Sequence, residues 1–112
     1  MKTLLMAVCT AAALGVATHA AAQQPAANDG KTLYEANCRM CHGPRGIPPQ
    51  TMAKMMKVPQ LDSAYFAKHT EDSVLVVLKK GKGTNMKSFA DRLTAEQMLA
   101  IAQYLRTMIK TP

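Results

Sequence analysis

The fold is decided by the stretch Cys38-Arg39-Met40-Cys41-His42, which reads CRMCH. Its two cysteines are three positions apart, on one helical turn, and a histidine follows directly. This spacing is the C-x-x-C-H pattern of covalent haem attachment. Two thiols so placed can form thioethers to the two vinyl groups of one porphyrin, and the adjacent imidazole then points at the iron. The pattern predicts one haem c, attached through Cys38 and Cys41, with His42 as an axial iron ligand.

Two other chemistries use similar cysteine patterns, and both fit this chain poorly. A thioredoxin-type C-x-x-C site belongs to a fold of alternating strands and helices, and this sequence shows no such alternation. A structural zinc site needs four ligands. Beyond Cys38, Cys41 and His42, only His69 and carboxylates remain after the leader described next.

The first 22 residues predict a secretory signal peptide. Lys2 precedes an apolar run from Leu4 to Ala17, and the small residues Ala20-Ala21-Ala22 offer a cleavage site. The run is too short for a bilayer, which needs about 20 apolar residues. We expect residues 1–22 to be removed, with cleavage after Ala20 as the alternative. Residues 23–112 then form one exported, soluble, periplasmic domain.

Composition indicates that this domain folds around something other than its own side chains. Aromatic residues make up 4% of the chain and tryptophan is absent, although aromatic side chains usually fill much of a small core. A disulfide between Cys38 and Cys41 would close a very small loop and contribute little stability. A domain of about 90 residues has only marginal stability unless something besides its own core stabilises it. We expect a cofactor to supply that stabilisation, which agrees with the attachment motif.

Periodicity and capping residues predict an all-α domain with long loops. Asn28 or Asp29 caps a helix that starts at Gly30, and the glycines and prolines of residues 43–49 predict a loop. One helical turn is expected over residues 51–57, and another short helix ends at Lys68, capped by Asp62 or Ser63. Residues 70–80 form a helix despite their β-prone valines, because acidic residues start it and Lys79, Lys80 and Gly81 end it. Thr94 and Gln97 make a capping box for the last helix.

The chain resembles the class I c-type cytochromes over all of residues 23–112. Besides CRMCH, Gly30 and Tyr34 match the family's first helix, and Ile101 and Tyr104 match the last helix, which crosses the first. The segment from Gly81 to Met86 resembles the family's distal methionine loop, although Lys87 stands where proline usually follows. The resemblance implies the small class I cytochrome fold.

The resemblance also implies roles for individual residues. Met86 becomes the sixth iron ligand, and His69 is the alternative. The nearer Met52, Met55 and Met56 are expected to pack against the porphyrin. A backbone carbonyl of Pro48 or Pro49 accepts the hydrogen bond from His42 Nδ1. Gly30 lets the first and last helices cross closely beside Tyr104.

The expected function is one-electron transfer between proteins, without catalysis of a reaction. Two alternatives are a haem subunit that stays bound to an oxidoreductase, and an enzyme or sensor with an open iron position. Removal of Lys2 leaves 13 basic and 7 acidic residues, a net charge of +6. Lys80, Lys82 and Lys87 cluster around the methionine loop and predict docking to acidic redox proteins, although charge clusters are often only solvated surface. Few aromatic residues are free to stack on bases, which argues against nucleic acid as a partner.

Overall fold

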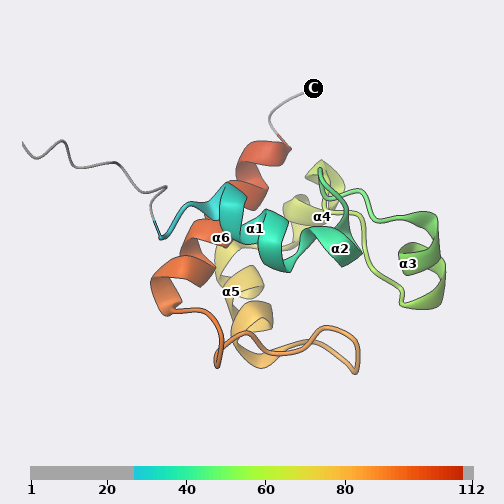
Figure 1. The fold of residues 1–112 in the computed structure, drawn as a ribbon. Coiled ribbons are helices and arrows are strands. Elements are labelled where there is room, and N and C mark those ends of the chain that lie inside the picture. Colours follow the sequence, from blue (N-terminus) through green and yellow to red (C-terminus); the bar gives the residue numbers. More distant parts are fainter. Residues whose placement is uncertain (1–26, 110–112) are drawn as a thin grey trace, which may run out of the picture.

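The computed structural model describes residues 27–109, and all regular elements in this range are helices. The predicted signal peptide lies outside the described residues. In chain order the helices are α1 (Gly30–Asn37), α2 (Arg39–His42), α3 (Gln50–Met55), α4 (Ser63–Lys68), α5 (Glu71–Lys80) and α6 (Ala95–Met108). Long loops join them, as Figure 1 shows. The predicted all-α class is confirmed, and no helix in this range is long and apolar enough to cross a bilayer.

The helices begin where the sequence predicts, because side-chain oxygens cap their unpaired backbone N–H groups. Asp29 caps α1 by accepting from Thr32 N at 2.9 Å, and Asp62 caps α4. Thr70 caps α5. At the start of α6 the capping box is complete, with Thr94 and Gln97 each accepting from the other's backbone N–H.

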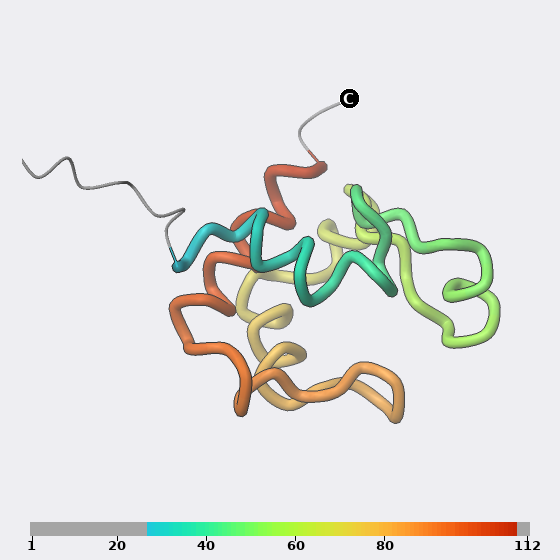
Figure 2. The backbone as a smooth tube through the Cα atoms, in the orientation of Figure 1, coloured from blue at the N-terminus to red at the C-terminus, as the bar shows by residue number. Residues whose placement is uncertain are grey.

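The first and last helices cross and form the frame of the domain. Figures 1 and 2 show α1 lying across α6, and α5 also packs against α6. The crossing is close because residue 30 is a glycine: a Cβ there would lie 2.1 Å from the Ala100 carbonyl oxygen and 2.9 Å from Tyr104 Cβ. The rings of Tyr34 and Tyr104 meet beside it, 5.6 Å apart. A larger residue at position 30 would therefore force α1 and α6 apart.

A small core lies where α1, α5 and α6 meet. Tyr34 and Ile101 are fully buried, and their neighbours come from α4, α5 and the segment after Met86. The Tyr34 hydroxyl crosses this core and donates to the Gly43 carbonyl oxygen at 2.7 Å. Burial raises the pKa of Tyr34, so the phenol keeps its proton and this hydrogen bond. The helix crossing is thereby tied to the end of the CRMCH segment.

Candidate functional site

The CRMCH segment comprises the junction between α1 and α2 and the whole of α2. Cys38 ends α1, and α2 then carries Cys41 and His42 on a single turn, with His42 N donating to the Cys38 carbonyl at 2.9 Å. Gly43 ends α2 with φ +76°, and a Cβ there would collide with the Ile47 carbonyl. Both cysteines are free thiols. The helix therefore presents two thiols and an imidazole within one turn, as the motif predicts.

These side chains border a two-part cavity. The inner part, about 50 Å³, lies against the core and is lined almost entirely by apolar side chains. The outer part, about 510 Å³, opens toward the loops and falls within the range of small-molecule and cofactor sites. Four residues line both parts and so join them: His42, Tyr65, Val77 and Met86.

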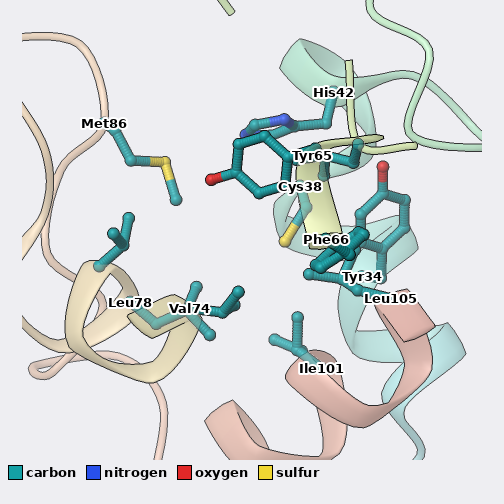
Figure 3. Close-up of a pocket in the computed structure, with 12 residues that line it drawn as sticks. Tyr34, Cys38, His42, Tyr65, Phe66, Val74, Leu78, Met86, Ile101 and Leu105 are labelled. Atoms are coloured by element: carbon teal, nitrogen blue, oxygen red, sulfur yellow. The ribbon is translucent and has the colours of Figure 1, made fainter. Parts of the chain in front are cut away.

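His42 and Met86 enter this cavity from different elements. Figure 3 shows the imidazole, which comes from α2, and the thioether, which comes from the loop after α5, both directed into the space between them. Cys38 lines the inner part and Cys41 the outer part. Burial against the apolar inner wall raises the pKa of the Cys38 thiol to about 11.

The His42 ring is suited to binding a metal. Burial lowers its pKa, which keeps the imidazole neutral with a free lone pair. Its Nδ1 is buried and has no hydrogen-bond partner among residues 27–109. The bond predicted from Nδ1 to a carbonyl of Pro48 or Pro49 is therefore not formed in this structure. Pro49 instead stands at the start of α3, and Pro48 is half-buried in the loop before it.

His69, the alternative ligand, also lines the outer cavity but is engaged elsewhere. Its ring stacks on Tyr65 with centroids 4.0 Å apart, and its Nδ1–H donates to the Tyr65 carbonyl at 2.8 Å. Arg106 donates to the His69 carbonyl at 3.3 Å. These contacts make His69 part of the cavity wall.

The three methionines of residues 52–56 lie in different surroundings. Met56 lines the outer cavity, as predicted, but Met55 is 81% exposed and Met52 lines neither part. Of the three methionines, the structure places only Met56 at the cavity wall. A helix as short as α3 has too few turns for periodicity to reveal which face is buried.

Several wall residues were not identified from the sequence. Tyr65 lines both parts of the cavity, and further apolar wall residues come from α4, α5, α6 and the loop before α4: Leu61, Phe66, Val74, Val77, Leu78, Ile101, Leu105. The three- and four-residue spacing of Val74, Val77 and Leu78 was a usable signal, because it defines one face of α5.

The cavity walls carry positive and no negative side-chain charge. Lys57 and Lys82 line the outer part, and neither part is lined by a carboxylate among the described residues. Lys80, Lys82 and Lys87 are all exposed, on or just after the end of α5. The predicted lysine cluster is therefore accessible beside the methionine-bearing loop.

An apolar cavity, two thiols on its wall and an unpaired buried imidazole together fit a covalently bound haem, and define the chain as a c-type haem protein. Comparison with known proteins gives the family. Residues 25–105 match the family model described as cytochrome c oxidase, cbb3-type, subunit III. This chain belongs to the c-type cytochromes; it is a monohaem cytochrome that carries electrons.

Individual relatives agree with this assignment. Cytochrome c6 of Thermostichus vulcanus is 34% identical over 107 residues, covering 94% of this chain and 91% of the relative. Chloroplastic cytochrome c6 of Chlamydomonas reinhardtii is 32% identical over 68% of this chain and 50% of its own length. Among solved structures, the KustC0563 c-type cytochrome is similar, with a TM-score of 0.67 and 26% identity over 72% of this chain and 98% of that one.

Proposed function

We propose that this cytochrome is a soluble periplasmic electron shuttle in which His42 and Met86 are the axial ligands and Cys38 and Cys41 form the thioethers. The observation that carries the proposal is the arrangement of His42 and Met86. One nitrogen donor and one sulfur donor enter the same cavity from two separate elements, and both thiols lie on its wall.

Each residue has a distinct task in this proposal. When bound, the haem supplies one-electron redox chemistry at its iron. His42 provides a neutral imidazole nitrogen, because burial disfavours its protonation. Met86 provides a thioether sulfur, which favours a higher reduction potential than a second imidazole would. The apolar inner wall excludes water, which also favours a higher reduction potential. If His42 and Met86 both bind the iron, they would leave no site there for a substrate, so the proposed function is electron transfer and not catalysis.

The proposed partners are acidic redox proteins. Lys80, Lys82 and Lys87 are exposed beside the loop that carries Met86, and this is the side of the cavity that opens outward. Positive charge there would orient the carrier during encounter and accelerate association about 10- to 1000-fold at low salt. The periplasmic location rests on the signal peptide predicted for residues 1–22.

A haem subunit held permanently by an oxidoreductase is the second candidate. The matching family model is named for an oxidase subunit, which favours this alternative. The match to Thermostichus vulcanus cytochrome c6, which covers nearly the full length of both chains, favours the carrier. Purification of the protein from an extract of its native cells distinguishes the two candidates. A carrier elutes as a single small protein, and a subunit elutes with its enzyme.

The ligand assignment is tested by Met86→Ala, with Met55→Ala as the matched control because Met55 is 81% exposed. Met86→Ala should keep its haem, lower the reduction potential on the order of 100 mV, and bind carbon monoxide when reduced. Met55→Ala should match the wild type in both measurements. An unchanged potential in Met86→Ala would rule out Met86 as the ligand and transfer the role to His69 or Met56.

A further inference from the structure

The loop that carries Met86 is a hairpin anchored to the end of α5. Gly81 N donates to the Val77 carbonyl at 2.7 Å and ends the helix. Lys82 and Met86 then pair in both directions, with N···O distances of 2.7 and 3.3 Å. The backbone of Met86 is thereby fixed relative to the outgoing arm of the hairpin, which continues directly from α5.

The returning arm, residues 88–90, is fastened to the same end of the helix. A helix leaves its last four carbonyls unpaired. Phe89 N donates to the Leu78 carbonyl at 2.8 Å, and the Ser88 hydroxyl donates to the Lys79 carbonyl at 2.6 Å. The same hydroxyl accepts from Ala90 N at 3.1 Å. Ser88 therefore joins the arm to the helix and also shapes the turn that follows.

The two arms lie too close for Ser88 to shift without moving Met86. A Cβ on Gly81 would be 2.5 Å from the Met86 carbonyl oxygen and 2.9 Å from Ser88 N. Only Lys87 separates Met86 from Ser88, and the buried ring of Phe89 secures the chain on the far side. A tether at Ser88 thus limits how far the backbone at Met86 can withdraw from the cavity.

We propose that Ser88 is a positioning residue for Met86: its hydroxyl clamps the returning arm to α5 and so keeps the thioether directed into the cavity. This inference rests on the proposed function, in which Met86 is an axial ligand. Withdrawal of the thioether requires the hairpin to swing away from α5, and Ser88 opposes that motion through its hydrogen bond to the Lys79 carbonyl. Loss of this bond should favour the withdrawn state about 2- to 10-fold.

The experiment measures imidazole binding to the oxidised haem protein, because added imidazole competes with Met86 for the iron. Ser88→Ala should bind imidazole about 2- to 10-fold more tightly than the wild type, while Ser88→Thr, which retains a hydroxyl, should match the wild type. Ser73→Ala is the control: its exposed hydroxyl also donates to a helix-terminal carbonyl, that of Thr70 at 2.8 Å, but at the opposite end of α5. Thermal unfolding of all three variants separates a local effect from general loss of stability.

Each outcome is decisive. Tighter imidazole binding in Ser88→Ala alone, with a melting temperature close to that of Ser73→Ala, supports the positioning role. Wild-type imidazole affinity in Ser88→Ala, or an equal increase in Ser73→Ala or Ser88→Thr, overturns it. Met86→Ala, measured alongside, distinguishes the two failures. If it binds imidazole far more tightly than the wild type, only the role of Ser88 has failed; if its affinity is unchanged, the ligand assignment has failed and the inference with it.

Discussion

Replacing Gly30 with alanine tests whether the crossing of α1 and α6 holds the domain together. The added methyl would lie 2.1 Å from the Ala100 carbonyl oxygen, which belongs to the backbone of α6 and cannot rotate away. Carbon and oxygen atoms need well over 3 Å, so the two helices would have to separate by about 1 Å. Overpacking of this kind costs about 1–3 kcal/mol. The gain in helix propensity from glycine to alanine, at most about 1 kcal/mol, does not offset the upper part of that range.

A net loss of about 1–2 kcal/mol in the free energy of unfolding is expected, and thermal unfolding of the haem-bound protein measures it. For a domain of this size each 1 kcal/mol shifts Tm by about 4–8 °C, so the expected decrease is about 4–16 °C. Lys31→Ala is the control, because Lys31 is the next residue of α1 and is exposed. It should change stability by less than about 0.5 kcal/mol. If Gly30→Ala and Lys31→Ala melt at the same temperature, the close approach of the helices is not a source of stability.

Because burial raises the pKa of Tyr34, the folded protein keeps a proton that the unfolded chain loses above about pH 10, so denaturant titrations should show stability falling as pH rises past 10. Tyr34→Phe should make this decline shallower, with the half-buried Tyr65 contributing the remainder, and should cost about 1–3 kcal/mol at pH 7 by leaving the Gly43 carbonyl unpaired. Cys38→Ala combined with Cys41→Ala should yield haem-free protein without a cooperative thermal transition, and a cooperative transition would show that the helices fold unaided. Charge reversal at Lys80, Lys82 and Lys87 should slow electron transfer to an acidic partner at low salt with little change in reduction potential, whereas Lys31→Glu should slow it less. A transfer rate that does not depend on salt would show that the lysine cluster is only solvated surface.

The elements of the fold were predictable because their signals are local. Caps such as Asp29, Thr70 and Thr94 lie within three residues of the N–H groups they satisfy, and the CRMCH spacing is contained in one turn. The helix over residues 71–80 was also predictable, because its acidic start and basic end outweigh the β preference of its valines.

The details that were missed depend on contacts between distant segments. Tyr65 lines both parts of the cavity only because α4 folds back toward α2, and nothing in its own neighbourhood marks it. The hydrogen bond predicted from His42 to a proline carbonyl depends on the backbone path of residues 43–49, which no local pattern specifies. The exposure of Met55 is set by where α3 lies relative to the rest of the domain, and Figure 1 shows α3 extending away from the crossed helices.

The crossing of α1 and α6 has a consequence for how this architecture tolerates change in length. Because the helices nearest the two ends of the described chain pack together, everything between them is one closed loop, stabilised at its base and pinned internally by α5. The entropy of closing a loop grows only with the logarithm of its length, so that doubling a flexible segment costs about 0.6 kcal/mol. The exposed stretch around α3 can therefore lengthen or shorten at small thermodynamic cost, whereas a single methyl group at Gly30 meets a rigid backbone. In this domain an insertion between the helices destabilises the fold less than one added carbon atom at the point where the helices touch.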